Sequence, residues 1–262
     1  MKPSGLDWLG DVPQHWEVKR LKFVFPVLRS GVSVNSENSP TTGDAPGILK
    51  TSCVYGNRFR PEENKRVLET EFDRLACPVT QDSLVISRMN TPELVGSCGY
   101  VDADYPQLFL PDRLWIARFS ERAELNGKFA WYLVTSHILA SLTAALATGT
   151  CDSMKNLTHE AFLDIAVGVP PKAEQLNIIS FLDTETARVD SLLTKKRELI
   201  ERLKEKRNSL VSRAVTRGLP PATARLAGMP ENPTLKPSGI DWLGDIPAHW
   251  EVKHLIRIIR VS

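Results

Sequence analysis

Residues 2–21 read KPSGLDWLGDVPQHWEVKRL, and residues 236–255 read KPSGIDWLGDIPAHWEVKHL. Sixteen of the twenty aligned positions are identical, and two of the four differences only replace leucine or valine by isoleucine. The copies lie 234 residues apart, which is too far for a solenoid repeat and suits a duplicated domain with its connector. Duplication of one short segment is the alternative. The repeat therefore predicts one full unit followed by the first residues of a second.

The segment 174–217 differs from the rest because it contains neither glycine nor proline. Apolar residues recur there in steps of four and three, with polar interruptions, as in the seam of a coiled coil: Ile178, Leu182, Val189, Leu192, Leu199, Leu203 and Leu210. A helix of this length extends about 66 Å, and the sequence from Gly218 to Pro221 is a typical stop signal. Such a long apolar stripe needs a second helix, so we expect antiparallel pairing. A single helix lying across its own domain is the alternative.

The pattern before this helix predicts a globular domain of the α/β (α+β) class. Short β-rich runs occur at 48–55, 83–89, 94–101 and 108–119, and helical patterns occur at 128–146 and after Thr158. We expect a globular domain over 1–170, the long helix over 171–218, a linker over 219–235 and the start of a second domain over 236–262. That last segment lacks the domain that should follow it, so we expect it to be peripheral.

The composition is that of an ordinary folded chain, with 42% apolar and 24% charged residues among 262. The net charge of +2 leaves nucleic-acid binding to a local basic patch. The four cysteines are far apart and form no metal-binding spacing with histidine, so we expect reduced thiols, a cytosolic location and no metal site. The uncharged stretch 129–147 contains polar residues, including His137, and favours a core helix over a membrane span.

Motifs of the relevant enzymes are missing from the sequence. Neither Pro-Pro pair has the flanking residues with which an adenine methyltransferase holds a flipped base, and neither nucleotide-binding glycine motif is present. The segment Pro61–Lys65 only faintly resembles a nuclease cluster. We therefore expect a non-catalytic chain without a cofactor of its own.

Residues suited to DNA contact are better represented. Arginine and asparagine side chains read guanine and adenine edges, and lysine side chains hold phosphates. The candidates lie at the ends of predicted elements or in polar loops: Arg88, Lys155, Asn156, Arg58, Arg60 and Arg113. Each alone is more commonly a solvated surface residue, so the group carries the prediction.

Four stretches give the chain a resemblance to the first half of the DNA-specificity subunit of type I restriction-modification enzymes. They are Ser4–Trp16, Asp82–Arg88 with its continuation to Tyr100, Ser153–Leu157, and Val169–Gln175 leading into the helix that ends at Arg213–Gly218. Together they span nearly all of 1–218, and the combination is specific although no single motif is.

The resemblance implies an α/β target-recognition domain that reads one half of a split DNA target. It also implies conserved helices that pair antiparallel and set the spacer, as well as double-stranded DNA, methyltransferase subunits carrying S-adenosylmethionine, and, through these, restriction subunits as partners. The second recognition domain of the family is missing here. The chain is then either a fragment or a half-length version that forms a homodimer. A methyltransferase or nuclease with an unrecognised site, and a coiled-coil scaffold, are the competing interpretations.

Overall fold

The computed structural model describes residues 1–151, 154–228 and 233–253, with side chains at 150 and 151 left out. The helices are α1 (Leu21–Val24), η1 (Thr51–Asn57), η2 (Glu69–Arg74), α2 (Gly127–Thr135), α3 (His137–Leu146), α4 (His159–Leu163), α5 (Lys172–Arg217) and α6 (Pro221–Leu226), of which η1 and η2 are 3₁₀ helices. The strands are β1 (Lys2–Pro3), β2 (Asp11–Val12), β3 (Glu17–Arg20), β4 (Leu28–Ser30), β5 (Gly47–Leu49), β6 (Asn64–Arg66), β7 (Pro78–Val79), β8 (Ser83–Ser87), β9 (Met89–Asn90), β10 (Cys98–Val101), β11 (Tyr105–Phe109), β12 (Leu114–Arg118), β13 (Thr148–Cys151), β14 (Met154–Asn156), β15 (Ala166–Val169), β16 (Leu235–Pro237) and β17 (Asp245–Pro247).

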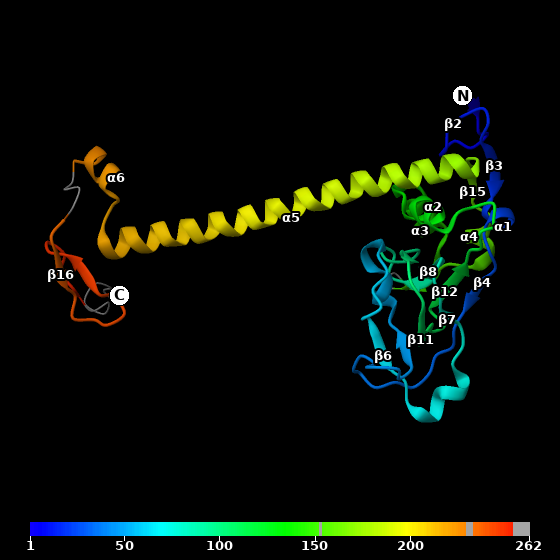
Figure 1. Cartoon of the computed structure of the whole chain (residues 1–262), viewed down its shortest axis with the longest axis horizontal. Coiled ribbons are helices and arrows are strands. Elements are labelled where there is room, and N and C mark those ends of the chain that lie inside the picture. The colour runs from blue at the N-terminus through cyan, green and yellow to red at the C-terminus, as the bar shows by residue number, and fades with distance from the viewer. Residues whose placement is uncertain (152–153, 229–232, 254–262) are drawn as a thin grey trace. The chain divides into compact units, whose positions relative to one another are not determined.

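An antiparallel sheet of order β10-β8-β12-β4 lies at the centre of the N-terminal part (Figure 1). Its two faces bury separate cores. Leu84 and Ile86 of β8 belong to the core shared with α2, α3 and α4, whereas Val85 belongs to the core shared with the sheet β6-β5-β11-β7. Because both faces of the sheet are covered, β8 reads as a continuous apolar run rather than an alternating one.

The predicted strands differ from the structure mainly where the chain turns. The run 83–89 is confirmed by β8 and β9, and 108–119 contains the end of β11, a turn and β12. The run 94–101 forms a strand only from Cys98, since Leu94 and Val95 belong to a turn that bonds back to Thr91. The strand expected over 48–55 is wrong after Leu49. A 3₁₀ turn follows there and buries Cys53 and Val54 in the second core.

The helical pattern at 128–146 forms two helices, because Ser136 ends α2 and its side chain caps α3. Buried residues of both helices, such as Phe129 and Leu139, belong to the first core, as expected for this uncharged stretch. Among the described residues, no single helix is long and apolar enough to cross a membrane. The two helices pass that test only together, with a bend of 71° between them.

The predicted long helix is present as α5, 46 residues that extend about 70 Å. The chain divides into two compact units, Met1–Thr184 and Glu185–Ser262, so the boundary falls within α5 and not before it. The physical reason is that the first turns of α5 join the globular unit, where Gln175 and Ile179 are buried. The segment expected as a linker contains the short helix α6, and residues 229–232 of it lie outside the described part.

The two copies of the sequence repeat fold into the same small hairpin. Lys2 pairs with Val12 in the first copy, and Lys236 pairs with Ile246 in the second. The equivalent backbone hydrogen bonds from Ser4 to Gly10 and from Ser238 to Gly244 measure 3.0 and 3.1 Å. Because these contacts are internal, the repeated sequence itself specifies the hairpin.

The second hairpin packs within the second compact unit, beside the end of α5 and α6. Ile246 is only 2% exposed, and Ala224 of α6 is only 1% exposed within the same compact unit. Residues 254–262, of which the first two complete the second copy of the repeat, lie outside the described part of the chain.

Candidate DNA interface

Two loops that are distant in sequence meet at one end of the central sheet. Arg88 connects β8 to β9, and β9 pairs antiparallel with β14. This pairing places Lys155 opposite Asn90 and Asn156 opposite Met89. The structure therefore brings together the three candidates Arg88, Lys155 and Asn156. Ser153, the first residue of the family-like stretch Ser153–Leu157, lies outside the described residues.

Arg88 is half-buried and is held from several directions. Its backbone N–H donates to the carbonyl of Arg113 over 3.1 Å, which places the exposed Arg113 beside it. Its Nη2 donates to Oδ1 of Asn156 over 3.5 Å. Its guanidinium carbon lies 5.9 Å from the ring centroid of Trp115, a cation–π distance. Arg88 thus supports the surface as well as charging it.

Trp115 is a buried platform beneath this surface. Its ring lies 4.4 Å from the ring of His159, centroid to centroid. Burial, and secondarily the charge of Arg88, lower the pKa of His159 below its ordinary value of 6.5, so the imidazole is mainly uncharged at neutral pH. Both Nε of Arg88 and Nε1 of Trp115 are buried, and neither atom has a hydrogen-bond partner among the residues that the structure describes.

A second connection joins η1 to the same surface. The side-chain amide of Asn90 donates to the hydroxyl oxygens of Tyr55 and Ser87, over 3.2 Å in both cases. Tyr55 precedes the exposed residues Arg58 and Arg60, whose turn packs on β10. A Cβ atom at Gly99 would lie 2.8 Å from the backbone nitrogen of Phe59, so this close approach requires glycine.

The arrangement has cations available for phosphates. Among the described residues, no ion pair involves Lys155, Arg60 or Arg113, whereas Arg58 has an interaction with another group. Tyr55, Asn90, Trp115 and His159 were not among the predicted site residues. Tyr55 and Asn90 lie inside the polar stretches that suggested the site, but nothing in the sequence pairs Trp115 with His159.

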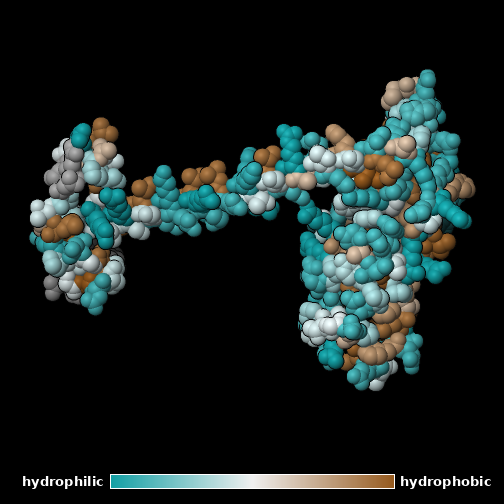
Figure 2. All heavy atoms as spheres, in the orientation of Figure 1, coloured by the Kyte–Doolittle hydropathy of each residue, from teal (hydrophilic) through white to brown (hydrophobic). Residues whose placement is uncertain are grey.

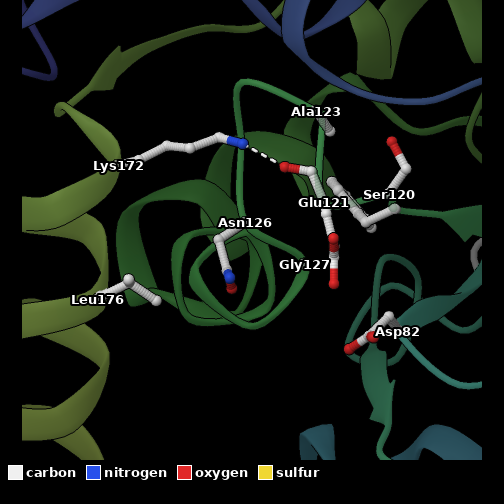
Figure 3. Close-up of a pocket in the computed structure, with 9 residues that line it drawn as sticks. Asp82, Ser120, Glu121, Ala123, Asn126, Gly127, Lys172 and Leu176 are labelled. Atoms are coloured by element: carbon white, nitrogen blue, oxygen red, sulfur yellow. Dashed lines mark hydrogen bonds between the residues drawn. The ribbon is translucent and has the colours of Figure 1, made fainter.

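A pocket of about 260 Å³ lies beside the start of α5 (Figure 3). Lys172 reaches across it to donate to the backbone carbonyl of Glu121, and Asn126 uses its side-chain oxygen to cap α2. Gln175, fully buried nearby, bonds the backbone of Asn126, Glu124 and Pro170 over 2.8 to 3.1 Å. These hydrogen bonds fasten the start of α5 to the globular unit, so we assign the polar groups around this pocket a structural role.

The described residues hold no group of three or more histidine, cysteine or acidic side chains arranged for a metal ion. Cys53 and Cys98 are free thiols, and burial raises the pKa of both well above the usual range. They therefore behave as core residues and not as reactive nucleophiles.

A sheet-based α/β unit with clustered arginine, lysine and asparagine side chains, continued by one long helix, has the organisation of a DNA-specificity module. The chain belongs to the type I restriction modification DNA specificity domain family, whose model matches residues 13–202.

The relatives agree with this family. The EcoEI type I restriction enzyme specificity subunit of Escherichia coli is 24% identical over 175 residues, which cover 66% of this chain and 29% of that protein. The HsdS subunit of Thermoanaerobacter tengcongensis has a similar fold, with a TM-score of 0.52, 19% identity, and coverage of 78% of this chain and 46% of that one. A chain in a structure that describes complex assembly and conformational transition of the type I R-M system also has a similar fold. Its TM-score is 0.60 and its identity is 18%, and the match covers 78% of this chain and 47% of that one. This chain therefore spans less than half the length of these relatives.

Proposed function

We propose that this type I specificity chain reads one half of a bipartite DNA sequence with the surface formed by β9, β14 and the segment before β12. The observation that carries the proposal is the convergence of Arg88, Lys155, Asn156 and Arg113 from separate parts of the sequence. Arginine and asparagine supply donors and acceptors for base edges, and Lys155 supplies a phosphate contact. Tyr55 and Asn90 position the neighbouring turn that bears Arg58 and Arg60.

The chemistry belongs to partners in this proposal. The chain docks methyltransferase subunits that hold S-adenosylmethionine, and through them restriction subunits, and is itself non-catalytic. Membership of a DNA specificity family supports this division of labour. Such a complex would bind double-stranded DNA in the prokaryotic cytosol.

The exposed seam of α5 supports pairing with a second copy. Ile178 and Leu182 lie near the globular unit and are partly covered, but Val189, Leu192, Leu199, Leu203 and Leu210 are each about half exposed. Apolar side chains follow one another along the surface of this helix (Figure 2). Because each is already half covered, completing its burial against a second helix of the same kind would contribute about 1 kcal/mol per side chain.

The charge along α5 favours an antiparallel partner. Residues 172–190 carry four acidic and two basic side chains, whereas residues 191–217 carry three acidic and nine basic ones. A parallel pair would place the basic ends side by side. An antiparallel pair of two copies places the acidic start of each helix beside the basic end of the other, which is electrostatically complementary.

The test is methylation-site mapping in a host that carries this chain with its methyltransferase partner. Two identical recognition domains about a two-fold axis should read a symmetric split sequence. Methylation at an asymmetric split sequence would contradict the homodimer, and methyl transfer or cleavage by the purified chain alone would favour the enzyme interpretation. A chain with no salt-dependent affinity for duplex DNA would instead be a scaffold.

A further inference from the structure

The first hairpin shows what the repeated sequence binds. The indole Nε1 of Trp16 donates to Oε1 of Glu174 over 3.0 Å, and Nε2 of His15 lies 2.7 Å from Oε2 of the same carboxylate. Glu174 lies in the first turn of α5. The ring of Trp16 covers Gly168, where a Cβ atom would approach it to 3.1 Å. We call this pair, His15 and Trp16, a clamp: it holds a glutamate in the first turn of a helix. Gly168, six residues before that glutamate, leaves room for the tryptophan ring.

The second hairpin carries the same clamp without a carboxylate. His249 and Trp250 are the equivalents of His15 and Trp16. Within the described residues, neither side chain has a hydrogen bond or ion pair. Together they border a cavity of about 180 Å³. Trp242, the equivalent of the core-packed Trp8, is 82% exposed.

The other side of this cavity is lined by a segment that resembles the one held by the first hairpin. The sequence Gly168-Val-Pro-Pro-Lys-Ala-Glu174 leads into α5, and Gly218-Leu-Pro-Pro-Ala-Thr-Ala224 leads into α6. Gly218 and Ala224 both line the cavity, and a Cβ atom at Gly218 would lie 3.8 Å from Pro247. The second hairpin thus packs on a helix start in which alanine stands where the first hairpin has its glutamate.

We propose that the hairpin at 235–250 is a second clamp for the start of α5, in which His249 and Trp250 hold Glu174 of a second copy of this chain. The occupant follows from the sequence, because Glu174 is the ligand that the same residues hold in the first hairpin. This inference rests on the antiparallel pairing proposed above, which brings the start of one helix beside the end of the other.

Exchange between the two copies conserves the contacts. When the second hairpin of one copy takes Glu174 of the other, the first hairpin of that other copy is released beside the Gly218–Ala224 segment. The two hairpins have the same histidine and tryptophan, so the number of clamps is unchanged. Such an exchange of equivalent elements has a low free-energy cost and links the two chains, as in domain swapping.

Zero-length crosslinking tests the clamp directly. A carbodiimide joins a lysine amine only to a carboxylate in contact with it. In an equal mixture of ¹⁴N- and ¹⁵N-labelled chains, His249→Lys should yield a 174–249 crosslink between differently labelled peptides. His15→Lys is the matched control, and this variant should yield a 15–174 crosslink within one chain. Glu174→Gln should abolish both links.

Two further variants make the result decisive. Trp16→Phe removes the indole donor from the first clamp and should raise the yield of the 174–249 link about tenfold, as expected for one charge-assisted hydrogen bond. Ala224→Glu supplies the missing carboxylate, and should replace the 174–249 link by a 224–249 link within the chain. A chain that is dimeric by sedimentation but gives no 174–249 link overturns this inference alone. A monomeric chain without the link overturns the proposed pairing as well.

Discussion

Lys155 and Arg88 lie on neighbouring segments of the candidate interface but in different surroundings. Lys155 is partly exposed on β14 and has no ion-pair partner among the described residues, whereas Arg88 is half-buried over Trp115. An arginine side chain that stacks on an indole contributes packing as well as charge. The two residues should therefore respond differently to substitution, although the sequence places both among the candidate DNA contacts.

Lys155→Ala should weaken binding of duplex DNA and reduce the dependence of log affinity on log salt by about one, because one phosphate contact is lost. The free energy of unfolding should not change. Fluorescence anisotropy over a salt series measures both affinity and slope. Arg122→Ala is the matched control, since Arg122 is exposed and follows the opposite end of β12 from Arg113. An unchanged salt slope for Lys155→Ala would remove this residue from the interface.

Arg88→Ala should weaken DNA binding and also lower the free energy of unfolding by about 1 kcal/mol, the usual scale for one lost cation–π contact. Arg88→Lys retains the charge but loses the planar stack, so it should share the stability defect. Urea unfolding separates the two effects. If both variants unfold like the original chain, Arg88 contributes only its charge.

Glu174 predicts a pH dependence of the first hairpin. Hydrogen bonds from His15 and Trp16 lower the pKa of Glu174 below its ordinary value of 4.5. A carboxylate with a depressed pKa stabilises the folded state above its unfolded pKa, and this contribution is lost as the pH falls through the folded pKa. The stability advantage of the original chain over Glu174→Gln should therefore shrink as the pH falls from the ordinary carboxyl value of 4.5 through the lower folded pKa. Thermal unfolding across pH 3–7 measures it, and a pH-independent difference would contradict the clamp.

At the scale of elements, the two ends of α5 have different surroundings. Its first turns are fixed to the globular unit by the buried Gln175 and by Asp183, which accepts hydrogen bonds from Lys128 and Tyr132 over 2.6 and 2.7 Å. Farther along, its apolar residues are exposed. The first turns of α5 therefore belong to the globular unit, whereas its later turns carry the exposed seam.

Leu192→Glu and Leu199→Glu should each convert a dimer into monomers, because they place an unpaired charge in the seam. Sedimentation velocity at tens of micromolar measures the change. Ser191→Glu adds the same charge to a neighbouring exposed position outside the seam, and should leave the dimer intact. An original chain that is already monomeric at this concentration would exclude pairing through α5.

The sequence predicts these elements unevenly for physical reasons. The long helix can be predicted because its seam repeats over the 33 residues from Ile178 to Leu210 without glycine or proline. Thr158, which precedes the second helical pattern, is a local signal, and its side chain caps α4. The break at Ser136 is harder to predict, because a single serine in an uncharged apolar stretch is a weak signal even though its side chain caps α3. The same holds for the site: Arg88 and Lys155 follow from local motifs, but the Trp115–His159 contact joins residues 44 positions apart.

At the scale of the molecule, the tail beyond α6 is the segment whose removal the structure makes informative. Both hydrophobic cores consist of residues between Leu21 and Ile179, so none of their side chains comes from the second hairpin. The seam from Val189 to Leu210 also precedes it. A chain that ends at Gly228 should therefore keep its main cooperative unfolding transition, with the free energy changed by no more than about 1 kcal/mol.

The same truncation should preserve DNA binding and the dimer, because the first hairpin of each copy can hold Glu174 when the second clamp is missing. The dissociation constant of the dimer should rise by no more than about tenfold, equivalent to about 1.4 kcal/mol. Calorimetry measures unfolding, sedimentation measures the dimer and anisotropy measures DNA binding, each on the truncated and the full chain.

Ala224 and the end of α5 lose their cover in the truncated chain, so a local loss of protection from proteolysis at α6 is expected. Aggregation, or loss of the cooperative transition, would show instead that the second hairpin is part of the main fold.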